Sequence, residues 1–341
     1  MVTFSEKTLA EQGFGVSWNR YVVPALEATA RQVRRRTVFA VVTSLLALVL
    51  AAVAIVMHAS VNDAMILAQP FNLALVVALA ALAVIGSWVV VLRHDAGLAA
   101  PVRDAVEAHF GELFTRDDNR AFGEVILQDL VSDGILDDRT YGVTAHHAGT
   151  YSDCRIRLIE ASASLRRQMV VDLLVLRVSL PYPADGEIRG DSDIQRLRSL
   201  IDQRDDLASF HVDHDQFDRI FTAACTHLGD AVRIVTRGLA ETVLQIQHRL
   251  ASPLDNGARA DPRVAFQVAD GSLTVVVGSQ VRRGRQARLG QAGAEKLARE
   301  LVMRFATAPA LVDELHGEAE VPAAFRPIPR SDEAQPRISI Q

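Results

Sequence analysis

The sequence has few cysteines and none of the short motifs from which an enzyme class is usually inferred. Its 341 residues include two cysteines, Cys154 and Cys225, with no Cys-x-x-Cys pair, so no disulfide framework is indicated and a reducing compartment fits. No Gly-x-Ser-x-Gly, Walker A, His-Glu-x-x-His or strand-following Gly-x-Gly-x-x-Gly motif occurs, so the common hydrolase, nucleotide and zinc-protease classes lack support. The sequence predicts no cofactor and leans away from an enzyme.

Charge is missing from two apolar stretches near the N-terminus, residues 37–57 and 70–92. As a helix rising about 1.5 Å per residue, the first spans roughly 31 Å, which matches the hydrocarbon core of a bilayer. A buried core helix fits less well because uncharged runs this long are rare in soluble folds, and a cleaved signal peptide fits less well because 36 residues precede the run. We predict transmembrane helices at 37–57 and 70–92, joined by a short extracytoplasmic loop at 58–69.

Basic residues lie before the first stretch and after the second, whereas the connecting residues 58–69 contain neither Lys nor Arg. The flanking residues are Arg31, Arg34, Arg35, Arg36 and Arg93. The positive-inside rule then predicts a multi-pass inner-membrane protein with both termini cytoplasmic. Residues 93–341 carry 37 acidic and 30 basic residues, so no nucleic-acid partner is expected. The expected partner is the lipid bilayer, with another membrane or cytoplasmic protein as a further candidate.

The rest of the chain mixes helix and strand patterns. Residues 1–36 favour a cytoplasmic helix that runs on into the first apolar stretch. Residues 93–130 favour amphipathic stalk helices, because four apolar residues recur there at four-residue steps. These residues are Val102, Val106, Phe110 and Phe114. Residues 316–341 contain four prolines and no apolar period, so a disordered tail is predicted.

Residues 131–308 are predicted to fold as a cytoplasmic α+β domain. Strands are expected at 154–163 and 168–180, and a helix capped by Thr236 is expected to follow. A late hairpin is expected to turn at Asp270-Gly271. Strict alternation of strands and helices is absent, so an α+β domain attached to a two-helix transmembrane hairpin fits better than a doubly wound sheet.

Four stretches of this pattern resemble a bacterial membrane-protein family, the domain of unknown function (DUF) 3137 family. They read YVVPALEATARQVRRR, DDRTYGVTAHHAGTYSDCRIRLIEASA, DQFDRIFTAACTHLGDAVRIVTRGLAETVLQIQHRLA and VAFQVADGSLTVVV. The matching residue types are Glu160 in the second stretch and Phe217, Phe221, Asp230, Arg233, Thr236 and Leu239 in the third. The chain departs from the family at QMVVDLLVL and at Thr236-Arg237. The resemblance implies this architecture but no activity, because the family has no agreed catalytic residues.

The stretch FHVDHDQFDRIFTAACTHLGD, residues 210–230, concentrates histidine and aspartate. If residues 210–215 are extended, His211 and Asp213 point to the same side and are candidate metal ligands. The structural alternative is that Asp215 caps a helix that begins at Gln216. A second scatter of possible ligands is interpreted as solvated loop residues. These are His146, His147, Asp153 and Cys154.

A basic run, VRRGRQAR, follows the predicted hairpin at residues 281–288. Near an anionic leaflet each basic residue gains about 1 kcal/mol, so this run is a candidate lipid-surface contact. The alternative is a solvated loop that pairs with the acidic excess of the domain. The arginines are Arg282, Arg283, Arg285 and Arg288.

Two functions are therefore considered from the sequence. The first is a membrane-anchored interaction or scaffold module. The second is a membrane-tethered metal-dependent hydrolase that uses the His/Asp cluster at 211–227.

Overall fold

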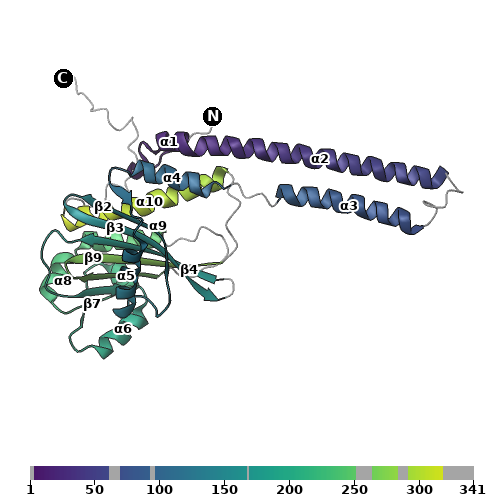
Figure 1. Cartoon of the computed structure of the whole chain (residues 1–341). Helices are drawn as coiled ribbons and strands as arrows, with labels where there is room; N and C mark the ends of the chain where they lie inside the picture. Colours follow the sequence, from purple (N-terminus) through teal and green to yellow (C-terminus); the bar gives the residue numbers. More distant parts are fainter. Residues whose placement is uncertain are drawn as a thin grey trace, which may run out of the picture.

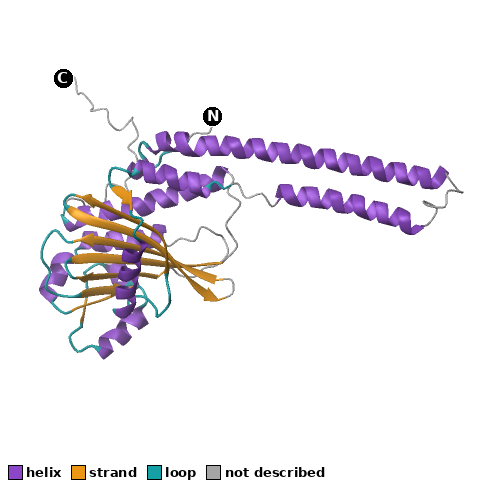
Figure 2. Ribbon diagram, in the orientation of Figure 1, coloured by secondary structure: helices purple, strands orange, loops and turns teal. Residues whose placement is uncertain are grey.

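A computed structural model describes residues 4–60, 70–92, 97–166, 169–250, 263–282 and 291–317. An α+β domain forms one part, and two long helices project from it (Figure 1). In the domain the strands gather in a single open antiparallel sheet with helices against it (Figure 2). The predicted α+β class is confirmed.

One run of helix carries the chain from the domain into the first apolar stretch. After a short 3-10 turn, η1 (Leu9–Glu11), the run consists of α1 (Phe14–Ser17), the π-helical η2 (Trp18–Val22) and α2 (Val23–Ser60). In η2 the Val23 N–H donates to the Trp18 carbonyl, five residues earlier, which widens the turn. Phe14, Trp18 and Val22 are fully buried. The start of this helix therefore belongs to the core of the domain.

The apolar part of α2 is exposed. Phe39 is 69% exposed and Leu48 is 63% exposed. The run Leu9–Val56 is the one helix among the described side chains that is long and apolar enough to cross a membrane, and only 11% of its most apolar window is buried. α3 (Pro70–Leu92) lies beside α2, where Trp88 Nε1 donates to Ser44 Oγ at 3.3 Å (Figure 1). The apolar stretch described for α3, Ala74–Val89, is shorter, so the second transmembrane helix stays a prediction.

The described strands form one sheet in the order β1-β2-β3-β4-β9-β8-β5-β7-β6. Both edge strands are three residues long, which leaves little unpaired edge backbone for another chain to join. The strands are β1 (Phe114–Arg116), β2 (Gly142–Tyr151), β3 (Cys154–Arg166), β4 (Met169–Ser179), β5 (Ile188–Asp191), β6 (Ala208–Phe210), β7 (Thr222–Cys225), β8 (Arg263–Ala269) and β9 (Ser272–Arg282).

Helices cover the two faces of the sheet unequally. The larger apolar core lies between one face and the helices α4 (Ala99–His109), α9 (Arg237–Leu250) and α10 (Gln291–Leu315). The other face is covered by α5 (Arg120–Ser132), which packs over a smaller apolar cluster. The shorter helices α6 (Ile194–Gln203), α7 (Asp215–Ile220) and α8 (Leu228–Ile234) lie in the connections.

The predicted division into a stalk at 93–130 and a domain at 131–308 needs correction. Val102 and Val106 of α4 are fully buried in the domain core, and Phe114 lies in β1. Phe110 stacks on Phe305 of α10 at 5.5 Å between ring centroids. A four-residue apolar period marks a face that packs, but it does not say against which element it packs.

The structure confirms the predicted helix cap at Thr236 and the predicted turn at Asp270-Gly271. Thr236 Oγ1 accepts a hydrogen bond from the Leu239 N–H at 3.2 Å, which confirms the predicted cap of α9. Asp270 and Gly271 have φ of 49° and 66°, as a two-residue hairpin turn requires, and they join β8 to β9. α10 continues to Leu315, beyond residue 308, where the predicted domain ends. Residues 61–69 of the predicted loop and residues 318–341 of the predicted tail lie outside the described residues.

Trp18→Ala should lower the free energy of unfolding by about 3–5 kcal/mol, because a fully buried indole ring is removed from the base of the helix. The matched control is Val16→Ala two residues earlier, where the side chain is 75% exposed and a change within about 0.5 kcal/mol is expected. Denaturant unfolding of the full chain in detergent measures both. Equal effects of the two substitutions would contradict burial of Trp18 in the core.

Candidate functional site

A row of polar side chains crosses the face of the sheet that α5 covers in part. The register pairs these residues in turn across β3, β4, β9, β8 and β5. Directly paired residues on antiparallel strands point to the same face, so the five side chains form one polar row. The row consists of Arg157, Arg177, Thr274, Gln267 and Arg189.

A second row on this face, two residues along each strand, is apolar. It contains Ile159, Val175, Val276 and Ala265, all of them buried in the cluster beneath α5. The face is thus divided into an apolar band, which anchors α5, and the polar row, which runs beside the helix from Phe122 near its N-terminal end to Asp133 just after it. The polar groups that these strands present on this face are therefore gathered in one row.

A cavity of about 310 Å³ opens beside the polar row at the C-terminal end of α5. That volume is at the lower end of the range of small-molecule sites, about 300–1,000 Å³. The sheet contributes Arg177, Gln267, Ala269, Asp270, Ser272 and Thr274 to the lining. The helix and the turn after it contribute Ile126, Asp129, Leu130, Ser132 and Asp133.

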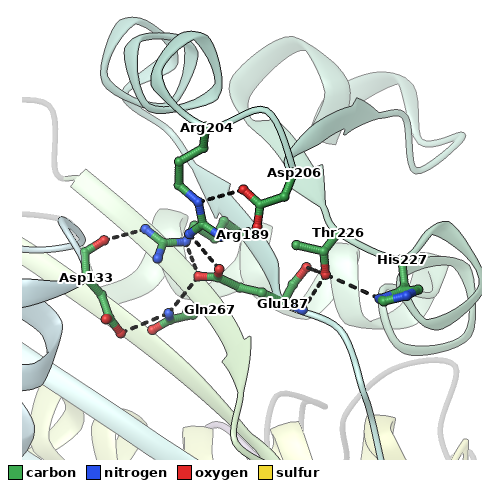
Figure 3. A network of polar contacts seen from close by, with 8 residues as sticks. All are labelled: Asp133, Glu187, Arg189, Arg204, Asp206, Thr226, His227 and Gln267. Atoms are coloured by element: carbon green, nitrogen blue, oxygen red, sulfur yellow. Dashed lines mark hydrogen bonds and ion pairs between the residues drawn. The ribbon is translucent and has the colours of Figure 1, made fainter.

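A hydrogen-bonded network joins the turn after α5 to the sheet (Figure 3). Gln267 Nε2 donates to Asp133 Oδ2 and to Glu187 Oε1, each at 3.0 Å. Arg189, only 5% exposed, donates from Nε to Glu187 Oε1 and from Nη1 to the Asp133 carbonyl. Arg204 Nη1 donates to Glu187 Oε2 at 2.8 Å. The position of Asp133 at the cavity is therefore set by contacts from two strands.

Glu187 is the central acid of this network. Burial raises the pKa of its carboxyl, but the charge of Arg189 and hydrogen bonds from Gln267, Arg189 and Arg204 outweigh burial, and the pKa is lowered from 4.5. Its backbone N–H also donates to Thr226 Oγ1 at 2.9 Å, next to His227 (Figure 3). Glu187 is thus ionised and fully engaged, which makes it a structural acid.

The other two arginines of the polar row are bound differently. Neither Arg157 nor Arg177 has a carboxylate within 4.0 Å in the described part of the chain. The Arg157 guanidinium lies 3.9 Å from the centroid of the Phe122 ring. Arg177 Nε donates to Ser272 Oγ at 3.0 Å, and Ser272 Oγ donates to the Ala269 carbonyl at 3.1 Å. Among the described residues, Arg177 is therefore the arginine of the row that lines the cavity and has no carboxylate within 4.0 Å.

A second polar cluster lies on the opposite face of the sheet, where β3 meets α4 and α10. Glu160 Oε2 lies 2.7 Å from Arg103 Nη1, and Glu160 Oε1 lies 3.3 Å from Arg304 Nη1. Burial raises the pKa of the Glu160 carboxyl, but Arg103 and Arg304 lower it by more, so the pKa falls below 4.5. The cluster joins α4 and α10 to the sheet by buried, compensated charges.

The adjacent histidines of β2 contact different helices. His147 Nε2 lies 3.1 Å from Glu107 Oε1 of α4, whereas the His146 ring stacks on Phe122 of α5 at 6.2 Å between centroids. Both rings are buried. Burial lowers the pKa of each from 6.5, and this is opposed for His146 by Asp117 and for His147 by Glu107.

The interpretation of His146 and His147 as solvated loop residues is wrong. Residues 142–151 form strand β2, which pairs with β3 along its length. The other two residues of that group also separate: Asp153 has φ of 62° in the turn after β2, and Cys154 is buried at the start of β3. Polar composition predicted a loop, but pairing with an apolar neighbouring strand determined the fold.

The predicted metal ligands His211 and Asp213 lie in the turn between β6 and α7. The His211 side chain is 89% exposed, and its Nδ1 is 4.0 Å from Asp218 Oδ1. Asp213 has φ of 59°, so the extended alternation on which the metal hypothesis depends is absent. No group of three or more His, Cys, Asp or Glu that could hold a metal ion occurs among the described residues. The hypothesis of a metal-dependent hydrolase gains no support from this geometry.

The predicted cap of α7 is also corrected by one residue. His214, not Asp215, is the N-cap, and its Nδ1 accepts the Phe217 N–H at 3.2 Å. Phe217 is fully buried and stacks on Phe221 at 4.7 Å between centroids, as the structural alternative requires. Further along the cluster, Cys225 lies buried in β7.

Of the predicted lipid-contacting arginines, Arg282 is the last residue of β9, while Arg283, Arg285 and Arg288 lie outside the described residues. Arg282 pairs with Met169 at the start of β4. This end of the sheet is on the side of the domain from which α2 and α3 project (Figure 1). Lipid contact by these arginines stays a prediction.

Comparison with known proteins identifies no relative, because no family model, no curated protein and no solved structure matches the chain significantly. The resemblance to the DUF 3137 family therefore stays a prediction. The function has to be inferred from the geometry of the molecule itself.

Glu160→Gln should lower the free energy of unfolding by about 3–5 kcal/mol at pH 7, because Arg304 and Arg103 would lose the buried carboxylate that they share. The matched control is Glu124→Gln on the exposed face of α5, with an expected change within about 0.5 kcal/mol. Denaturant unfolding measures both variants. A loss below about 1 kcal/mol for Glu160→Gln would show that the cluster does not hold α4 and α10 to the sheet.

His146→Phe should weaken the dependence of stability on pH. A buried ring whose pKa is lowered in the fold binds fewer protons than the unfolded chain does, so stability falls as the pH drops below 6.5. The substitution removes that contribution while His147 keeps its own. Thermal unfolding between pH 5 and 7.5 measures the slope, with His211→Phe at an exposed site as the control. If the unfolding temperature of His146→Phe depended on pH as strongly as that of the unsubstituted protein, a lowered pKa of His146 would be refuted.

Proposed function

We propose that the protein is a membrane-anchored interaction module, with α2 and α3 as a transmembrane hairpin and the α+β domain at the cytoplasmic face of the inner membrane. The observation that supports this most directly is the helical run from α1 to α2. Its first turns are buried in the domain, and its apolar part exposes large side chains such as Phe39. Water would oppose that exposure, whereas lipid chains accept it, and a helix satisfies its own backbone hydrogen bonds there.

The base of this helical run is fixed to the domain from two directions. Phe14 packs edge-on against His109 of α4 at 5.5 Å between ring centroids. Arg299 of α10 donates to both carboxylate oxygens of Glu11 at 2.9 Å, and its guanidinium lies 4.6 Å from the Phe4 ring centroid. A helix held in this way gives the domain a defined orientation relative to the bilayer, which a flexible linker would not do.

The distance between core and membrane also supports the proposal. Fourteen residues of α2, from 23 to 36, separate the last buried residue of η2 from the predicted span, and at about 1.5 Å per residue they cover roughly 21 Å. Arg31, Arg34 and Arg35 are exposed in this part of the helix. The arginines would then lie at the headgroup level of the cytoplasmic leaflet.

The chemistry of the buried groups favours recognition over catalysis. Burial raises the thiol pKa of Cys154, mainly through loss of solvent, and does the same for Cys225, so neither is activated as a nucleophile. The buried carboxylate of Glu160 and the partly buried carboxylate of Glu187 are engaged by arginines. An interaction role therefore fits the described groups better than the hydrolase alternative.

Cysteine accessibility tests the topology, because the two native cysteines are buried. In intact bacterial cells a membrane-impermeant maleimide should label an Asn62→Cys variant, placed in the predicted extracytoplasmic loop. A Gln128→Cys variant on the exposed face of α5 should be labelled only after lysis. The protein without either substitution sets the background, and alkaline carbonate should leave all three proteins in the membrane pellet.

Labelling of Gln128→Cys before lysis would place the domain outside the cytoplasm and overturn the proposed orientation. Labelling of Asn62→Cys only after lysis would overturn the two-span hairpin. Release of the protein by carbonate would overturn membrane insertion itself.

A further inference from the structure

The cavity beside α5 is lined by charges of both signs that do not pair with one another. Arg177 contributes a guanidinium from β4, and Asp129, Asp133 and Asp270 contribute carboxylates from α5, the turn after it and the hairpin turn. Across the described residues, no ion pair of 4.0 Å or less joins Arg177 to any of the three. The three aspartates are exposed to solvent, where opposite charges gain little from direct pairing.

Hydrogen bonds of the cavity wall hold two of these charged groups in place. Arg177 is held by Ser272, whose hydroxyl accepts from Nε at 3.0 Å. Asp133 is held by Gln267, which donates to its Oδ2 at 3.0 Å. Because Gln267 and Ser272 are themselves buried, their side chains have little freedom to follow a moving partner. Arg177 and Asp133 are thus held before a ligand binds, which lowers the entropic cost of ordering these two groups.

The charges define the class of ligand that would fit. A simple anion would meet Arg177 but would be repelled by the aspartates, and a simple cation would meet the aspartates but would leave Arg177 without a counter-ion. A molecule with one group of each sign satisfies both. We propose that this cavity binds a small zwitterion of the amino-acid type, with its carboxylate on Arg177 and its ammonium group facing Asp129 and Asp133.

Further groups suit the same ligand. Arg177 can bind a carboxylate through parallel N–H donors, the geometry that guanidinium groups favour. Thr274, buried at the adjacent position of the polar row, adds a hydroxyl to the lining. The volume of about 310 Å³ suits a molecule of few atoms. This inference concerns the domain alone and does not depend on the membrane topology proposed above.

Ligand binding is tested on the full chain in detergent by thermal unfolding and isothermal titration calorimetry. The probes are glycine, β-alanine, 4-aminobutyrate and 5-aminovalerate, which place the two charges at increasing separation. Acetate and methylammonium, each with one of the charges, are the matched controls. At least one zwitterion should raise the unfolding temperature saturably, and the two controls at the same concentration should not.

Two variants locate the site. Arg177→Gln and Asp129→Asn should each weaken binding of that zwitterion at least tenfold. Asp129 is exposed, so its substitution tests the site without disturbing the core. The matched controls are Arg155→Gln on the neighbouring strand β3 and Asp118→Asn ahead of α5, both exposed and outside the cavity lining. Unchanged binding in these controls is expected.

Absence of saturable binding for every zwitterion would overturn the inference. So would equal stabilisation by acetate, which would indicate a simple anion site. Binding that persists at full affinity in both Arg177→Gln and Asp129→Asn would place the ligand elsewhere. None of these outcomes would affect membrane insertion, which is measured separately by cysteine labelling and carbonate extraction.

Discussion

The structure depends on one helical run whose start is buried in the domain and whose apolar continuation is exposed. Phe14, Trp18 and Val22 are buried in the domain core, while the same helical run continues as α2 into an apolar sequence with exposed side chains. Because backbone hydrogen bonding is continuous through the π-helical turn, the domain and the apolar helix have a fixed relation. α4, the first described helix after α3, then packs against the base of this run and closes the core.

The domain also depends on two glutamates that are paired with arginines. Glu160 between α4 and α10, and Glu187 between the turn after α5 and the sheet, are each bound by two arginines. Such clusters specify how helices meet the sheet more than they add stability, because burying each charge carries a desolvation cost. Arg177 departs from this pattern, since its hydrogen bond goes to a hydroxyl. Departures of this kind mark positions where a protein can recognise a ligand.

Sequence reasoning succeeded where short-range physics decides the outcome. The α9 cap at Thr236, the Asp270-Gly271 turn and strands β3, β4, β8 and β9 follow from capping, turn chemistry and apolar patterning. It missed β5, because Ile188–Asp191 lies in a loop-like sequence and becomes a strand only by pairing with β7 and β8. It also considered His211 and Asp213 as candidate metal ligands, but the left-handed conformation of Asp213 interrupts the assumed strand.

The sequence by itself determined the long apolar helix, the α+β class and the β8–β9 hairpin, since these depend on residues that are close along the chain. The tertiary structure alone decided the polar row, because Arg177, Thr274 and Gln267 come from three strands and their alignment depends on register. It likewise decided that α4 is part of the core rather than a stalk. Register and packing are properties of contacts between distant segments, and composition and periodicity do not encode which segments will meet.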